Sequence, residues 1–171
     1  MIRKQLTTLG AGAALAALLS VALVNPWPAL AHGDHASHNK HSSQSFAAGE
    51  PGDVKRPFRT VEVIMKDEDG KMSYTPDRID VKRGEQVKFV LKNAGIVDHE
   101  FLIDTVKNNA LHKEEMAKDP DMQHEEPNGA RLKPGETKEI LWRFSKAGTF
   151  EFACLLPGHY ESGMKGVVAI K

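Results

Sequence analysis

The chain has 171 residues, with 23 basic and 23 acidic side chains and no formal net charge. This length allows one ordinary domain with appendages, and the balanced charge excludes a generic nucleic-acid-binding protein, which carries a strong basic excess. Hydrophobic residues make up 40% of the chain, which excludes a wholly disordered protein. The single cysteine, Cys154, excludes internal disulfides and zinc sites built on cysteine pairs.

Residues 1–31 have the pattern of a secretory signal peptide. Arg3 and Lys4 precede an apolar stretch over residues 9–24, and residues 29–31 read Ala-Leu-Ala, the small-x-small pattern of a cleavage site. The apolar stretch is slightly short for a bilayer span, so an uncleaved anchor is the less favoured alternative. We expect cleavage after Ala31, export to the periplasm, no membrane attachment afterwards and a small negative net charge.

Residues 32–56 contain few apolar side chains and are rich in His, Ser and Gly, which predicts a flexible tail. Four histidines recur there at every third position: His32, His35, His38 and His41. In an extended polyproline-like chain this spacing places all four imidazoles on one side. His-rich tracts are typical of metal capture, so we expect an accessory metal site, with a merely solvated polar tail as the alternative.

Residues 57–171 alternate apolar and polar side chains between turn signals, which predicts β-strands. The alternation covers residues 61–66, 79–82, 87–92, 140–144, 150–154 and 166–170, and a hairpin turn is expected at residues 67–70. Apolar side chains near helical spacing over residues 105–118, stopped by Pro120, predict one short helix. Residues 119–135 are expected to form a loop. Several short strands at this spacing predict an all-β sandwich or barrel.

The residues with metal chemistry gather after two of the predicted strands. Cys154, His159 and Met164 recur at intervals of five in one loop that contains Pro and Gly, and His99 follows a strand far upstream. Two imidazoles and a thiolate with a weak thioether suit copper in electron-transfer sites. This ligand set lies between the preferences of Cu(I) and Cu(II), which keeps rearrangement on electron transfer small.

Each of these residues also has a simpler interpretation. A lone cysteine is often a small buried hydrophobe and a lone methionine is usually packing. A thiol enzyme could use His159 as the base, but it would leave His99 and Met164 unexplained, so we do not predict an enzyme. Zinc is a poor match for a thioether ligand. A weaker second metal cluster lies between the ligand segments, although ordinary helix and loop surface is the favoured reading of its members: His112, Met116, Met122 and His124.

The pattern over residues 57–171 resembles the cupredoxins, the small blue-copper proteins such as plastocyanin, azurin and rusticyanin. The motifs that carry this resemblance are Tyr74-x-Pro76, Ile79-x-Val81-x-x-Gly84-Glu85-x-Val87-x-Phe89, Asn93-x-Gly95, His99-Glu100-Phe101, Gly148-Thr149-Phe150 and the Cys154–Met164 loop. The resemblance implies a Greek-key β-sandwich of seven or eight strands. It also implies one type 1 copper whose ligands are His99, Cys154, His159 and Met164.

The family resemblance implies two further features of the site. Electrons would enter and leave through an apolar surface beside His159, formed here by Leu155, Leu156, Pro157 and Gly158. Many cupredoxins carry Asn or Ser directly after the first histidine ligand, where its side chain ties the two ligand loops together. This chain has Glu100 instead. The hydrogen bonds around the copper, its reduction potential and its colour therefore depend on what Glu100 contacts.

The His-rich tail resembles that of periplasmic copper-tolerance cupredoxins of Gram-negative bacteria. We therefore expect a periplasmic protein with one redox-active copper that contributes to copper tolerance, with more copper on the tail. Two alternatives remain open: a dedicated electron shuttle between respiratory partners, and a copper buffer or metallochaperone. The expected partner is a periplasmic redox protein or a copper-handling protein, and the expected oligomeric state is a monomer.

Overall fold

A computed structural model describes residues 46–122 and 126–171. The predicted signal peptide, the four tail histidines and His124 lie outside the described residues. The elements in chain order are β1 (Glu50–Pro51), β2 (Arg59–Glu68), β3 (Lys71–Thr75), β4 (Arg78–Val81), β5 (Gln86–Asn93), β6 (His99–Asp104), α1 (Val106–Met116), β7 (Gly129–Leu132), β8 (Thr137–Arg143), β9 (Gly148–Ala153) and β10 (Lys165–Ile170).

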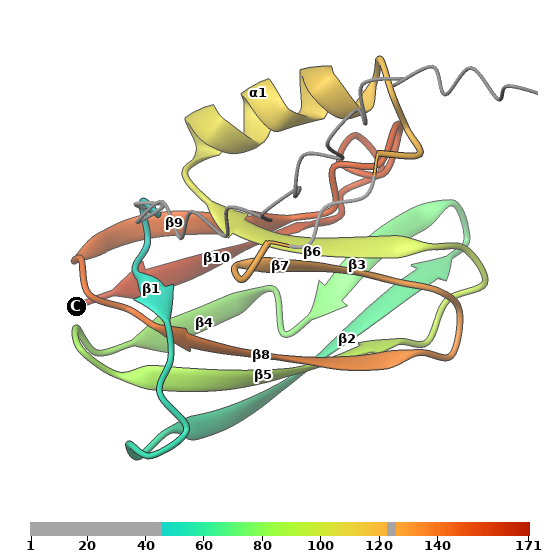
Figure 1. The fold of residues 1–171 in the computed structure, drawn as a ribbon. Coiled ribbons are helices and arrows are strands. Elements are labelled where there is room, and N and C mark those ends of the chain that lie inside the picture. The colour runs from blue at the N-terminus through green and yellow to red at the C-terminus, as the bar shows by residue number, and fades with distance from the viewer. Residues whose placement is uncertain (1–45, 123–125) are drawn as a thin grey trace, which may run out of the picture. The chain divides into compact units, whose positions relative to one another are not determined.

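The strands form two five-stranded sheets that face each other, with α1 beside one of them (Figure 1). The first sheet has the order β1-β8-β5-β2-β3 and the second has the order β4-β10-β9-β6-β7. The pairs β2–β5 and β4–β10 are parallel, and the remaining pairs are antiparallel. The all-β sandwich with one short helix is therefore confirmed.

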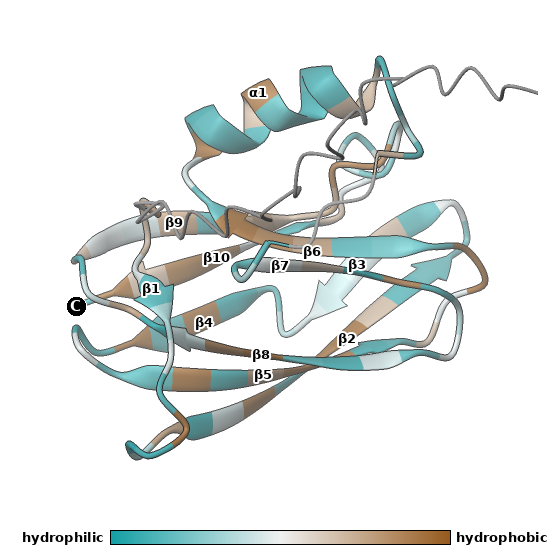
Figure 2. Cartoon of the chain, viewed as in Figure 1, coloured by the Kyte–Doolittle hydropathy of each residue, from teal (hydrophilic) through white to brown (hydrophobic). Residues whose placement is uncertain are grey.

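The predicted alternation accounts for the core. In β5, Val87, Phe89 and Leu91 are fully buried, and strands of both sheets show the same apolar stretches on Figure 2. Aromatic rings pack both between and within the sheets: between ring centroids, Phe101 lies 5.4 Å from Phe89 of the first sheet and 5.1 Å from Phe152 of its own sheet. Each fully buried side chain of this kind stabilises the fold by about 1.5–3 kcal/mol. The core therefore holds the two sheets in fixed positions and gives the site a rigid base.

The described residues form ten strands, not the seven or eight expected. One addition is β7, which lies within the predicted loop over residues 119–135 and pairs antiparallel with β6. A Cβ on Gly129 would lie 2.6 Å from Leu102 Cδ1 and 3.1 Å from Phe101 O, so the two strands approach each other closely at this glycine. This strand has only four residues, begins with glycine and shows little alternation of apolar and polar side chains, so the sequence pattern did not predict it.

The folded domain begins earlier than the predicted boundary at residue 57. Phe46 is buried and its ring packs edge-on against Trp142, with the centroids 5.1 Å apart. The backbone N–H of Gly52 donates to Leu141 O at 2.8 Å, and β1 pairs with β8. The prediction of a flexible tail is therefore wrong over residues 46–56. A polar composition does not prevent packing when one aromatic side chain covers the edge of the core.

The predicted helix is confirmed as α1. Thr105 caps its first turn, because the side-chain oxygen accepts the N–H of Asn108 at 3.1 Å. The buried residues of α1 are Asn109 and Met116, whereas Leu111 is 52% exposed, so the apolar spacing did not identify the buried face. Asn109 Nδ2 donates to Glu151 Oε1 on β9 at 3.1 Å, which docks α1 beside the second sheet. Within residues 46–122 and 126–171 no helix has the length and apolar character needed to cross a membrane.

Candidate metal centre

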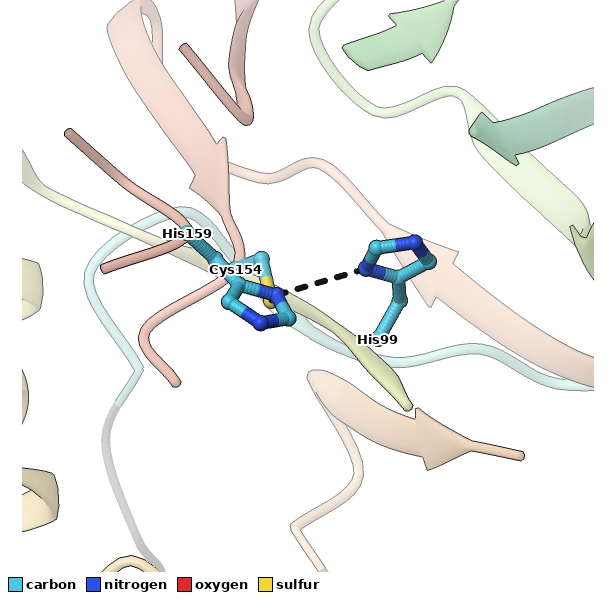
Figure 3. Close-up of side chains that lie close together, drawn as sticks. All are labelled: His99, Cys154 and His159. Carbon is cyan, nitrogen blue, oxygen red and sulfur yellow. Dashed lines mark hydrogen bonds between the residues drawn. The ribbon is translucent and has the colours of Figure 1, made fainter. Parts of the chain in front are cut away.

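The side chains of His99, Cys154 and His159 meet at one end of the sandwich (Figure 3). One nitrogen from each imidazole and the cysteine sulfur all lie within 4.8 Å of one another. His159 Nδ1 is 3.4 Å from His99 Nδ1 and 3.2 Å from Cys154 Sγ. His99 and Cys154 are fully buried and His159 is partly exposed. These atoms form a compact set of two nitrogen donors and one sulfur donor that can enclose a single metal ion.

Strand pairing explains why residues 55 positions apart meet. Strands β6 and β9 are antiparallel neighbours, with Leu102 opposite Ala153. The start of β6 therefore lies at the same end of the sheet as the end of β9. His99 is the first residue of β6, and Cys154 directly follows β9. The loop from β9 to β10 then supplies His159.

The segment from Cys154 to Met164, which we call the ligand loop, is closed by its own backbone hydrogen bonds. The N–H of Cys154 donates to Met164 O at 3.1 Å, and the N–H of Met164 donates to His159 O at 3.1 Å. The N–H of His159 donates to Leu156 O at 3.0 Å. Met164 is fully buried and is paired by its backbone with Cys154, and its role as the axial ligand stays a prediction. These bonds fix the positions of the donor atoms before any metal binds.

The loop from β5 to β6, residues 94–98, carries the chain from the first sheet to the second, and we call it the crossover loop. Asn93 is buried and holds this loop: its Nδ2 donates to Val97 O at 2.8 Å and its Oδ1 accepts the N–H of Gly95 at 2.9 Å. Asn93 Nδ2 also donates to Leu132 O on β7 at 3.0 Å. The Asn93-x-Gly95 motif therefore has a structural role, which is to deliver His99 to the site.

A carboxylate that the sequence did not indicate contacts the first imidazole. Asp67 Oδ1 lies 3.0 Å from His99 Nε2, on the side of the ring that faces away from Cys154 and His159. Asp67 belongs to β2 in the first sheet, whereas His99 belongs to β6 in the second. His99 Nε2 therefore contacts the first sheet, whereas Nδ1 contacts His159 of the ligand loop.

Glu100 ties the two ligand segments together in spite of replacing the usual Asn or Ser. Its backbone N–H donates to Cys154 Sγ at 3.2 Å, and its Oε2 accepts the N–H of Leu155 at 3.2 Å. Glu100 is buried, and its carbonyl oxygen accepts the Tyr74 hydroxyl. The chain thus keeps the tie between the loops and adds a carboxyl group beside the cysteine.

Burial controls the protonation of the donor atoms. Removal from water raises the pKa of the Cys154 thiol to about 12, and the nearby Glu100 carboxylate adds to the rise. Burial also lowers the pKa of His159, with a further contribution from the charge of His99. Without metal the thiol is therefore protonated and the His159 imidazole is neutral at neutral pH. A metal ion must displace the thiol proton on binding.

The predicted electron-transfer surface needs a correction. Leu155 is fully buried and Leu156 is 6% exposed, because the ligand loop folds back and both side chains pack into the core. Pro157 and Gly158 are exposed beside the partly exposed His159, as expected. Large exposed apolar side chains come instead from the crossover loop, where Ile96 is 84% exposed.

The structure gives a partial view of the predicted accessory sites. The tail histidines and His124 lie outside the described residues, so these sites stay predictions. Met116 is fully buried in the core, and Met122 packs against the core. His112 Nδ1 lies 3.9 Å from Glu115 Oε2 on the same helix. Core packing accounts for both methionines without any metal.

The family model for copper binding proteins of the plastocyanin/azurin family matches residues 61–171. The chain belongs to this family. Copper is therefore its cofactor, and the cluster of two imidazoles and one thiol fits copper by its donor chemistry. The fold also matches solved cupredoxin structures. Auracyanin B has a TM-score of 0.58 and 22% identity, and the match covers 72% of this chain and 96% of that chain. Reduced auracyanin from Roseiflexus castenholzii has a TM-score of 0.55 and 23% identity, and the match covers 68% of this chain and 99% of that chain.

Curated relatives are similar over most of their length. A protein of Rubrivivax gelatinosus named "Copper-resistant cuproprotein CopI" is 45% identical over 141 residues, which cover 82% of this chain and 83% of the relative. A protein of the same name from Pseudomonas aeruginosa is 33% identical, and the match covers 80% of this chain and 89% of the relative. Another from Vibrio cholerae is 34% identical, and the match covers 77% of this chain and 80% of the relative. None of these names describes an enzyme.

Proposed function

We propose that this protein is a periplasmic copper-tolerance cupredoxin that holds one redox-active copper between His99, Cys154 and His159, with Met164 as a weak axial ligand. The observation that carries the proposal is the convergence of two imidazole nitrogens and one buried sulfur within 4.8 Å. The name shared by three relatives, one of them 45% identical, supports the tolerance role. The leader pattern of residues 1–31 supports export.

Each protein group has a defined task in this proposal. Cys154 supplies a thiolate, which receives a hydrogen bond from the backbone N–H of Glu100. His99 and His159 supply neutral imidazoles, and burial keeps His159 neutral. Copper bound there would supply a one-electron couple. The ligand loop holds the donors in fixed positions, which limits the rearrangement between the two oxidation states.

The first experiment is a copper titration of the protein without residues 1–31, followed by optical and EPR spectroscopy. We expect one equivalent of copper to produce an intense thiolate-to-copper absorption, and Cys154→Ser to abolish it. His112→Ala is the matched control, because His112 lies outside the cluster and its loss should leave the spectrum unchanged. An undiminished band in Cys154→Ser would refute the assignment of the thiolate.

A second experiment separates copper tolerance from a dedicated electron shuttle. The partly exposed imidazole of His159, between the buried sulfur and solvent, is the feature that favours a shuttle. A deletion strain is complemented with the wild-type gene, with Cys154→Ser and with a gene that lacks residues 32–41. If copper tolerance depends on the protein, growth in copper falls in the deletion strain and recovers with the wild type. Normal growth in copper with impaired respiration would refute the tolerance role and favour the shuttle.

A further inference from the structure

We propose that Asp67 is a positioning residue that fixes the tautomer of His99 and biases the copper site toward Cu(II). This inference rests on the ligand assignment proposed above. It concerns the contact between Asp67 Oδ1 and His99 Nε2 at 3.0 Å, which joins the two sheets at the site. His99 is fully buried and the Asp67 side chain is 11% exposed, so little water competes for this contact.

The carboxylate of Asp67 is held in place by a second partner. The backbone N–H of Ile96 lies 2.9 Å from Oδ1 and 3.2 Å from Oδ2 of Asp67. The N–H of Ala94 donates to Met65 O at 2.9 Å, so the crossover loop lies alongside the end of β2. The carboxylate thus receives hydrogen bonds from both the loop and the imidazole. The hydrogen bond from the Ile96 backbone therefore holds the Asp67 carboxylate in place, in addition to its contact with the imidazole.

Gly95 provides an independent sign that the contact is built into the fold. A Cβ at residue 95 would lie 1.6 Å from Asp67 Oδ1 and 2.8 Å from His99 Nε2. Neither distance is physically possible for a settled side chain, so any residue larger than glycine would displace the carboxylate from the imidazole. The crossover loop therefore leaves the space in which Asp67 and His99 meet.

This geometry has two chemical consequences. The carboxylate accepts a hydrogen bond from the N–H at His99 Nε2, which keeps the proton on that nitrogen, leaves the Nδ1 lone pair directed at the cluster and raises the basicity of the ligand. A fixed negative charge one hydrogen bond away from a ligand also stabilises the more positive metal state. Both effects strengthen the binding of Cu(II) relative to Cu(I). Partners of this kind typically change metal affinity by about 10–100-fold.

The test compares two carboxylates near the same site. Asp67→Asn removes one negative charge but keeps an oxygen that can accept from His99 and Ile96. Asp98→Asn is the matched control: Asp98 precedes His99, also acts on the pKa of His159, and pairs with Arg131 at 3.2 Å rather than with the imidazole. Spectroscopic redox titration at one fixed pH gives the ratio of the Cu(II) and Cu(I) affinities in each protein.

We expect Asp67→Asn to lower this ratio about tenfold, equivalent to a rise of about 59 mV in the one-electron reduction potential. Asp98→Asn should change it by less than about threefold, because its charge is partly exposed and already paired. Equal shifts in the two variants, or no shift in Asp67→Asn, would overturn the proposal. A wild-type protein without the thiolate-to-copper band would instead refute the ligand assignment, so the two failures are distinguishable.

Two further measurements separate positioning from folding. Gly95→Ala leaves every charge in place but forces the carboxylate away, so we expect it to lower the affinity ratio in the same direction. Nitrogen NMR of the copper-free wild-type protein reports the tautomer directly, with no variant that could misfold. In the neutral form of the imidazole we expect the proton on His99 Nε2 and not on Nδ1. A neutral imidazole with its proton on Nδ1 would overturn the proposal.

Discussion

The buried thiol predicts a loss of stability of the copper-free protein at alkaline pH. Folding raises the pKa of Cys154 from 9.0 to about 12, mainly through burial. A raised pKa means that the folded state holds the proton more tightly, so its contribution is complete below pH 9 and is lost as the pH rises toward 12. Three pKa units at 1.36 kcal/mol each give about 4 kcal/mol. That is a large fraction of the stability of a domain of this size.

The assay is urea unfolding of the copper-free protein between pH 8 and 12, with a reductant to keep the thiol free. Cys154→Ser is the perturbation, because serine can still accept from the Glu100 N–H but does not ionise in this range. Other groups also titrate there, so the informative quantity is the wild-type free energy of unfolding minus that of the variant. We expect this difference to fall by about 4 kcal/mol across the window. Parallel curves would refute the reasoning.

Tyr74 needs its own control in this experiment. Burial raises its pKa well above the ordinary value, and the charge of Cys154 contributes to the rise. Its ionisation could therefore overlap with that of the thiol. Tyr74→Phe removes the phenol, and the difference between wild type and Cys154→Ser should persist when both proteins carry this substitution. Disappearance of the difference in the Tyr74→Phe background would assign it to the tyrosine.

Three further outcomes follow from the same contacts. Phe46→Ala should lower the free energy of unfolding by about 3 kcal/mol. Leu111 is exposed, so Leu111→Ala should change it by less than about 0.5 kcal/mol. Equally small effects of the two substitutions would place residue 46 outside the core. Glu100→Gln should make the alkaline loss of stability smaller and end it at a lower pH, with the onset near pH 9 unchanged, since it removes a negative charge that raises the pKa of Cys154 in the folded state; an unchanged profile would contradict that role. Copper affinity measured by chelator competition should fall with acidification as protons compete for His159, and a flat profile from about pH 7 to 4 would argue against imidazole ligation.

Local spacing was enough to predict that Cys154 and His159 lie in one cluster. Cys154, His159 and Met164 lie in one loop, and a loop between neighbouring strands keeps its residues close together. The upstream ligand, His99, could be predicted because it follows an alternating strand that had to join the same sandwich. The strands β2, β5, β8 and β9 could be predicted for the same reason, since one face of each is apolar and buried.

Burial within loops could not be predicted from alternation. Leu155 and Leu156 follow a strand and precede Pro157 and Gly158, which is a pattern that fits an exposed apolar patch equally well. Their burial depends on the backbone bonds that fold the ligand loop back onto the core. Phe46 presents the opposite case, because a single aromatic residue in a polar segment carries no periodic signal, although it packs on Trp142.

The role of Asp67 depends on contacts between sheets. Sequence reasoning places residues 67–70 at a hairpin turn, and the turn is present between β2 and β3. The contact with His99 arises because β2 and β5 run parallel, with Met65 opposite Asn93, so that the crossover loop leaves the first sheet beside the end of β2. The one sequence signal is Gly95. The reason for glycine at this position becomes clear only from the structure, in which the Asp67 carboxylate occupies the space that a side chain at residue 95 would fill.

The position of His99 is thus set by both halves of the sandwich. Its Nδ1 faces donors that the second sheet supplies, and its Nε2 contacts a carboxylate that the first sheet supplies. Sequence spacing identifies the donor side, because those residues follow the strands on which they depend. It does not identify the partner of Nε2, because a carboxylate near a turn has many possible contacts. A change in the packing of the two sheets would therefore alter the orientation of this ligand even when every donor residue is retained.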